Sequence, residues 1–239
     1  MNFNEPIPTF WESVKARQNL KLASERISKH LKDDAYEFPF KFQEDVAKTV
    51  KEAFSALSNP ETASDENTLG QHMTRGIASQ FVTGYHNFKQ KNQSVEFKIS
   101  KPINVVVTGA HLYYGPFPAP EGYVAQNWLG FLTLIIPGEH SNFENHTRQK
   151  ELLKSASDEG VYFRIDTIVE TDIEIIVTDD STGLPVLRDR RTRFGVTFTS
   201  PHFTPWDEIF DLQPDYSWKL KWDWKMSDVD GVLKKIQNK

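Results

Sequence analysis

Apolar and charged residues alternate strictly near the C-terminal end of the chain, in the segment 216-YSWKLKWDWK-225. Every second residue there is apolar, namely Trp218, Leu220, Trp222 and Trp224. Because successive side chains of a strand point to opposite faces, this pattern predicts a strand with one apolar and one charged face. We expect the apolar face to form a wall of the core. The alternative is an exposed aromatic platform for sugars or bases.

Near the N-terminus, apolar residues recur at steps of three and four, which is typical of amphipathic helices. The stripe is strongest in the third such segment, where apolar residues from Leu69 to Phe88 share one face. Asn59-Pro60 ends the second helix, because proline disrupts a helix interior. Ser64 or Asp65 is suited to cap the third. The predicted helices cover residues 10–32, 43–58 and 65–89.

Beyond residue 93 the hydrophobic period changes to two, which predicts strands. Pro102 marks a bend in the first strand region, and the turn 180-DSTG-183 predicts a long hairpin. We expect the apolar segment 123–137 to be one strand that is either buried on both faces or lies under a helix. The polar residues 139–159 should contain a short helix at 146–155 or form a mobile insertion, and a short helix should close the chain at 227–239. The predicted strands cover 95–115, 123–137, 161–179, 184–200 and 216–225.

Helices come first in the chain and strands follow, an order that predicts an α+β fold. We expect N-terminal helices packed on a curved antiparallel sheet. Residues 1–42 should form an extended leading segment and a cationic amphipathic arm. Residues 43–239 should form a single α+β domain of cone-like shape.

Composition narrows the function classes. The chain has 239 residues and a net charge of −5, so as a whole it is no polyanion binder, although a local basic patch is compatible with that total. It has no cysteine, which excludes disulfides, thiolate metal sites and a cysteine nucleophile, and favours a reducing compartment. No apolar run approaches the roughly 18 residues of a membrane span. The N-terminal residues lack the apolar core of a secretory signal.

No catalytic motif emerges from the sequence, which has neither a glycine-rich phosphate loop nor a GxSxG nucleophile. A metal between His140, Glu144 and His146 is one interpretation, but histidines in polar loops are mostly solvated. Asp166 and Tyr85 would be candidates in a pocket enzyme such as an isomerase or dehydratase. We expect no catalytic residues, no cofactor and no metal.

The first predicted helix is strongly basic outside its apolar stripe. From Lys15 to Lys32, six cations stand against the single anion Glu25. Such a helix lies on an anionic membrane, or is the remnant of an organellar targeting signal. A helix that packs on the rest of the protein with solvated lysines gives the same pattern. The candidate membrane or partner contacts are Trp11, Lys15, Arg17, Lys21, Arg26, Lys29 and Lys32.

A second basic run is 188-RDRRTR-193. On a strand its four arginines divide between the two faces, which weakens the case for a single patch. One interpretation is a solvated hairpin tip with Asp189 as a local ion partner. The other is contact with a phosphate backbone, such as ribosomal RNA, or with an acidic partner. The candidate contacts are Arg188, Arg190, Arg191 and Arg193.

The helix pair 53-AFSALSNPETASDENTLGQHMT-74, the hairpin 173-IEIIVTDDSTGLPVLRDRRTRFGVTFTS-200, the loop 201–215 and a closing strand with Trp218 follow one another in a distinctive order. In this order the chain resembles the C-terminal domain family of the subunit that tethers the mitochondrial import motor to the inner membrane. A mitochondrial large-ribosomal-subunit protein has a related domain. The resemblance covers roughly residues 43–225 and consists of element order rather than an invariant signature. The chain departs from it in its proline-rich segment, its polar insertion and its final helix.

The resemblance implies a fold of the nuclear-transport-factor-two type, a cone of helices against a curved sheet. It implies a non-enzymatic adaptor or scaffold at the matrix face of the mitochondrial inner membrane, in protein import, ribosome tethering or complex assembly. The implied partners are the import machinery, the ribosome or a respiratory assembly, with ribosomal RNA and the anionic membrane surface. The alternatives are a pocket enzyme of the same fold and an RNA-binding ribosomal component.

Overall fold

The computed structural model describes residues 10–31, 37–140, 146–203, 210–214, 218–220 and 224–229. The chain divides into two compact units, each assembled from three stretches of sequence. The first unit takes residues 1–38, 109–164 and 201–221, and the second takes 39–108, 165–200 and 222–239. The domain boundary that the sequence predicts at residue 42 stays a prediction.

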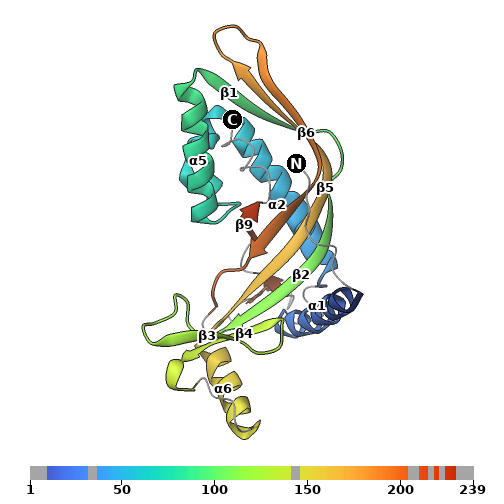
Figure 1. Cartoon of the computed structure of the whole chain (residues 1–239), viewed down its shortest axis with the longest axis vertical. Coiled ribbons are helices and arrows are strands. Elements are labelled where there is room, and N and C mark those ends of the chain that lie inside the picture. The colour runs from blue at the N-terminus through green and yellow to red at the C-terminus, as the bar shows by residue number, and fades with distance from the viewer. Residues whose placement is uncertain are drawn as a thin grey trace. The chain divides into compact units, whose positions relative to one another are not determined.

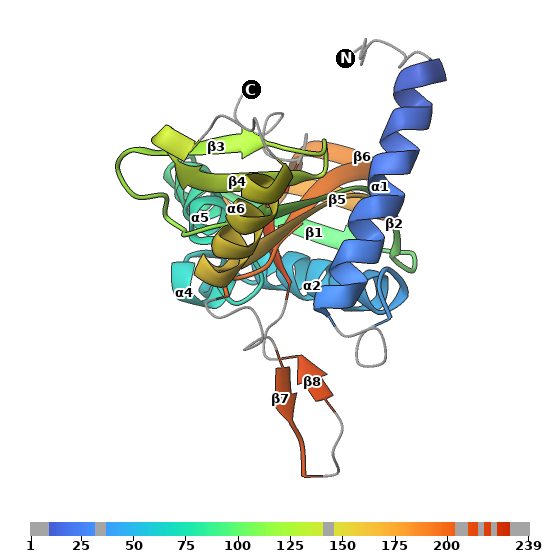
Figure 2. The ribbon, with the colours of Figure 1, turned by 90° about the horizontal axis from the view of Figure 1, so that it is seen from below.

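The first unit contains helix α1, helix α6 and part of the seven-stranded sheet. β4 pairs with β3 in antiparallel and with β2 in parallel orientation, and α6 lies against β4 (Figure 2). β7 and β8 form a two-stranded antiparallel ribbon of their own. The elements are α1 (Phe10–His30), β3 (Tyr123–Asn127), β4 (Leu132–Pro137), η1 (Gly138–His140), α6 (His146–Glu159), β7 (Phe210–Leu212), β8 (Trp218–Leu220) and parts of β2 (Asn104–Tyr114) and β5 (Val161–Asp179).

The segment 123–137 is two strands, not the single buried strand predicted from its apolar composition. The turn between β3 and β4 requires glycine at position 130, where φ is +74°. The backbone of Gly130 also approaches Asn19 of α1 so closely that a Cβ would lie 2.7 Å from the Asn19 Nδ2 atom. Of the two strands, β4 is the buried one, as far as residue 136. The helix predicted around 146–155 is confirmed as α6.

The second unit packs helices against strands. α2 and α5 both contact β1 (Figure 1). β1 runs antiparallel to β5 with Phe97 opposite Ile175, and β9 runs antiparallel to β6 with Val196 opposite Val229. The elements are α2 (Phe40–Ser58), α3 (Pro60–Ala63), α4 (Glu66–Leu69), α5 (Arg75–Gln90), β1 (Gln93–Ile99), β6 (Pro185–Thr199), β9 (Lys225–Val229) and parts of β2 and β5.

The core of this unit draws on helix α2 and on the hairpin. Val50, Phe54 and Leu57 of α2 are buried. The long hairpin of β5 and β6 has the predicted limits to within one residue at each end. Further large side chains that are fully buried in this unit include Phe42, Leu69, Met73, Phe198 and Trp224.

The third predicted helix is broken in two. Asp65 caps α4, as predicted, by accepting hydrogen bonds from the backbone N–H groups of the second and third residues after it. The chain then leaves the helix, because residues of the break pair with β9. The Thr74 N–H donates to the Met226 carbonyl at 2.7 Å, and the Met226 N–H donates to the His72 carbonyl at 3.0 Å.

The tryptophan segment 216–225 is also not one strand. Its described residues divide between β8 and the start of β9, with Trp224 just before β9. The predicted burial of Trp224 is confirmed, since 1% of its surface is exposed. Trp222, Lys221 and the side chains of Trp218 and Lys219 lie outside the described residues. The predicted terminal helix is wrong at 227–229, which belong to β9, and its remainder lies outside the described residues.

The α+β class is confirmed, with helices α2 and α5 packed on the sheet as expected. The sheet is mixed rather than purely antiparallel, because β2 and β4 pair in parallel over Leu112–Tyr114 and Leu132–Leu134. A parallel pair needs a longer connection than a hairpin turn. The chain provides it with the proline-rich loop and with β3 between β2 and β4.

Candidate functional site

Helix α1 has one fully buried stripe. Ala23, Ile27 and Leu31 follow one another at steps of four and have no exposed surface. Residues four apart lie on the same face of a helix, so these side chains form the buried part of the predicted apolar stripe. Because the stripe is covered within the folded chain, α1 does not present it to a membrane.

The outer face of α1 is basic and exposed. Among the residues that the structure describes, no ion pair joins its cations to a carboxylate. The one anion among them, Glu25, is exposed as well, and so are the apolar residues Val14 and Leu22. The side chain of Trp11 and the whole of Lys32 lie outside the described residues. The predicted contacts found exposed on this face are Lys15, Arg17, Lys21, Arg26 and Lys29.

The charge of Arg26 acts on the phenol of Tyr114, a residue of β2. Tyr114 is buried, with 3% of its surface exposed. Burial raises the pKa of Tyr114 to about 12, and the positive charge of Arg26 opposes that shift. The phenol is therefore neutral at physiological pH. It does not cancel the charge of Arg26, which stays part of the basic face.

The second basic run, on β6, has a different electrostatic setting. Each of its four arginines pairs with a carboxylate, three of them from β5, so the run is neutralised within the hairpin. An RNA or acidic partner would have to share or displace these carboxylates, and the predicted contact stays a prediction. The pairs are Arg188–Glu174 at 2.6 Å, Arg190–Asp172 at 2.8 Å, Arg191–Asp189 at 3.2 Å and Arg193–Glu170 at 3.8 Å.

Asp172 on β5 is a buried carboxylate. Its side chain is 5% exposed, and its Oδ2 atom lies 2.8 Å from both the Lys101 Nζ and an Arg190 guanidinium nitrogen. The hydrogen bonds from Lys101 and then Arg190 hold the pKa of Asp172 below its usual range. A buried carboxylate needs such partners, because an unpaired one is costly to desolvate.

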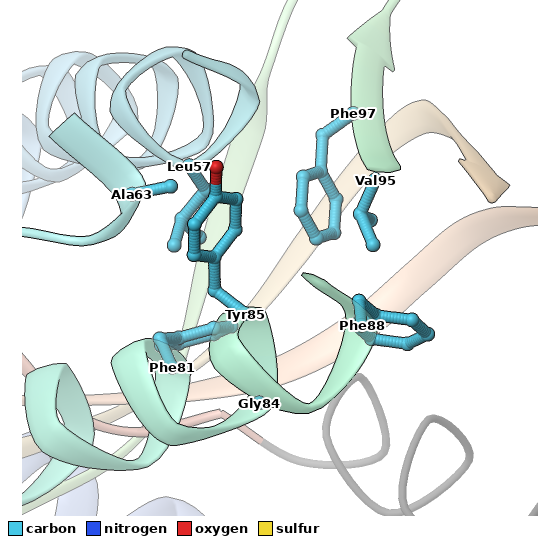
Figure 3. Close-up of a pocket in the computed structure, with 8 residues that line it drawn as sticks. All are labelled: Leu57, Ala63, Phe81, Gly84, Tyr85, Phe88, Val95 and Phe97. Atoms are coloured by element: carbon cyan, nitrogen blue, oxygen red, sulfur yellow. The ribbon is translucent and has the colours of Figure 1, made fainter. Parts of the chain in front are cut away.

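An apolar pocket lies between α2, α3, α5 and β1 in the second unit (Figure 3). Tyr85 is its single titratable lining residue, whereas an acid–base enzyme needs at least two converging groups. Asp166, the other enzyme candidate, does not line it, and its Oδ1 atom accepts a hydrogen bond from Thr197 at 2.7 Å. The pocket therefore offers no acid–base pair. Its lining residues are Leu57, Ala63, Phe81, Gly84, Tyr85, Phe88, Val95 and Phe97.

The first unit contains a row of aromatic rings. The sequence does not predict this row, because its residues come from three separate segments. Tyr113 and Tyr162 stack with ring centroids 4.4 Å apart, and Phe117 lies 5.2 Å from Tyr162. His111 and His202 continue the row at either end. Burial first, and then Tyr113, raise the pKa of Tyr162 to about 12, against the effect of a nearby arginine. The Tyr162 phenol is therefore neutral at physiological pH.

No group of three or more histidine, aspartate or glutamate side chains in the part of the chain that the structure describes is placed to hold a metal ion. The predicted His140–Glu144–His146 cluster lies outside the described side chains. None of the helices in the described ranges is long and apolar enough to span a bilayer.

Neither the protein-family models nor the curated proteins contain a match to this chain.

Proposed function

We propose that the protein is a non-enzymatic adaptor at the matrix face of the mitochondrial inner membrane. In this role it holds an import, ribosomal or assembly complex at the membrane surface. The resemblance of residues 43–225 to the import-motor tethering family supports the location. The exposed basic face of α1 is the observation that carries the proposal, because it supplies a surface for anionic lipid.

The α1 face suits a surface contact rather than insertion. Its buried stripe at Ala23, Ile27 and Leu31 is engaged within the protein, so the helix contributes mainly charge. Each cation near an anionic leaflet contributes on the order of 1 kcal/mol, and salt weakens this attraction. Five exposed cations therefore give reversible, salt-sensitive binding.

Flotation of the full chain with vesicles tests this contact. The protein should float with phosphatidylcholine–cardiolipin vesicles at low ionic strength, and should not float with phosphatidylcholine alone. Replacing the basic residues of α1 by glutamine should abolish flotation. Equal flotation of this variant would overturn the proposed contact. The replaced residues are Lys15, Arg17, Lys21, Arg26 and Lys29.

Two control variants sharpen the test. Replacing Arg188, Arg190, Arg191 and Arg193 by glutamine removes a similar charge but should leave flotation intact, since these arginines are already paired. Glu25→Gln removes the one anion among the α1 cations and should make flotation more resistant to salt. Circular dichroism of each variant checks that the fold is preserved.

Fractionation of cells tests the proposed location. The tagged protein should sediment with mitochondrial inner membranes and be released by high salt, as expected of a contact dominated by charge. Recovery of the protein outside mitochondria would contradict the location without affecting the vesicle result.

A further inference from the structure

The outer edge of strand β3 is open to solvent. Within the described ranges, β3 pairs with β4 alone and ends the strand order on that side (Figure 2). We propose that this edge pairs with the same edge of a second copy of the chain, in antiparallel orientation and with a two-fold axis at Ala125. The inference does not depend on the proposed adaptor function.

The hydrogen-bond pattern of β3 shows which backbone groups face outward. In an antiparallel pair, hydrogen bonds are exchanged at every second residue. The Trp128 N–H donates to the Leu132 carbonyl at 2.8 Å, so the even-numbered residues of β3 are the ones bonded to β4. The backbone groups of Ala125 and Asn127 therefore point away from β4. No residue that the structure describes bonds to them.

Other edges in the described part of the sheet have protection that β3 lacks. Ser58 bonds to the N–H and the carbonyl of Phe97 at the edge of β1, and Met226 of β9 bonds to the break between α4 and α5. The part of β6 that β9 does not reach begins with Pro185 and carries Asp189 and the four arginines. Covering segments, proline and charge are the devices that keep sheet edges from pairing with other chains.

Strand β3 is uncharged and partly apolar at its surface. No charged residue lies between Glu121 and Glu139, and the strand itself, YVAQN, contains neither proline nor glycine. Ala125 is exposed, and so is Val124, with 40% of its surface accessible. An exposed edge of this composition is a template for a further strand.

The chemistry of this edge favours a second copy as the further strand. A two-fold axis is the commonest symmetry of homo-oligomers and places each surface against itself. With the axis at Ala125, its N–H and carbonyl bond to those of the other Ala125, and the Asn127 N–H reaches the Tyr123 carbonyl of the other copy. Like charges opposite each other would oppose this pairing, and β3 has none. A strongly charged partner strand would find no opposite charge here.

Charge variants at the axis test the pairing. The ladder has five residues on each chain, so the dimer belongs to the weak class that forms as concentration rises. Sedimentation velocity should show the 27.6 kDa monomer of the full chain converting to twice that mass. Ala125→Lys and Ala125→Glu should each abolish the dimer, and an equimolar mixture of the two should restore it at low salt. Ala16→Lys, at an exposed alanine of α1, should dimerise as the wild type does.

Disulfide crosslinking provides a second readout. The chain has no cysteine, so Ala125→Cys carries one thiol in a known place. Facing α-carbons of a hydrogen-bonded antiparallel pair lie about 5.5 Å apart, within the roughly 4.4–6.8 Å that a disulfide spans. Oxidation by copper–phenanthroline should join two Ala125→Cys chains and leave Ala16→Cys unjoined.

Four results would overturn the proposal. The wild type stays monomeric at every concentration, or Ala125→Lys, folded by circular dichroism, dimerises as the wild type does. The mixture of Ala125→Lys and Ala125→Glu fails to dimerise, or the cysteine variants at positions 125 and 16 crosslink equally.

Discussion

The indole of Trp224 meets the ring of Phe42 edge to face, with centroids 4.8 Å apart and ring planes at 90°. Phe42 is fully buried, and Phe198 approaches it from β6 at 5.9 Å. This contact joins the first turn of α2 to the chain just before β9. Trp224→Ala should lower the free energy of unfolding by about 3–5 kcal/mol, measured by urea denaturation.

Two phenylalanines on α2 provide the control for this prediction. Phe42→Ala should cost a similar amount, whereas Phe40→Ala should change stability by less than about 0.5 kcal/mol, because 69% of Phe40 is exposed. Equal effects of the two substitutions would mean that the Phe42–Trp224 contact does not anchor α2.

Ser58 covers a free edge of the sheet at Phe97. Its hydroxyl accepts from the Phe97 N–H at 3.0 Å, and its one proton is shared between the Phe97 and Phe54 carbonyls, each at 2.9 Å. Ser58→Ala should cost about 1–2 kcal/mol, because both backbone groups lose their partner at a half-buried site. Ser64→Ala, whose hydroxyl bonds to local carbonyls in an exposed turn, should cost much less. A null effect at Ser58 would indicate that water replaces the hydroxyl.

The elements predicted correctly from the sequence are those whose pattern is local. In α2 and in the hairpin of β5 and β6, the repeat of apolar residues is complete within a short stretch of sequence. The break between α4 and α5 could not be predicted this way, because it depends on Met226, more than 150 residues further along the chain. The turn at Gly130 was hidden within an apolar run that continues into β4.

The basic face of α1 is visible in the sequence, since charge and helical period are both local properties. The pairing of the β6 arginines is not visible in the sequence. Arg190, for example, pairs with Asp172 on the neighbouring strand β5. The pocket could not be predicted, because its walls come from four elements. Sequence reasoning considered Tyr85 for a pocket but paired it with Asp166, which does not line this one.

Gly76 and Gly84 of α5 allow a prediction about the free energy of unfolding. Gly84→Ala and Gly76→Ala should each raise the free energy of unfolding by about 0.4–1 kcal/mol, since alanine fits both sites and lowers the entropy of the unfolded chain. Thermal denaturation measures both. Destabilisation by Gly84→Ala alone would show that position 84 lacks the space for a Cβ that the structure gives it.

Asp172 makes the stability of the hairpin depend on pH. Its pKa is lowered in the folded chain, first by Lys101 and then by Arg190. A lowered folded pKa stabilises the protein above the unfolded value of about 3.9, and this stabilisation is lost as pH falls through the folded pKa. Urea unfolding from pH 7 to about pH 3 should therefore show the advantage of the wild type over Asp172→Asn shrinking in acid. Lys101→Gln removes the largest contributor to the shift, so it should move that loss to higher pH. A constant difference between wild type and Asp172→Asn over this range would show that the carboxylate charge does not stabilise the fold.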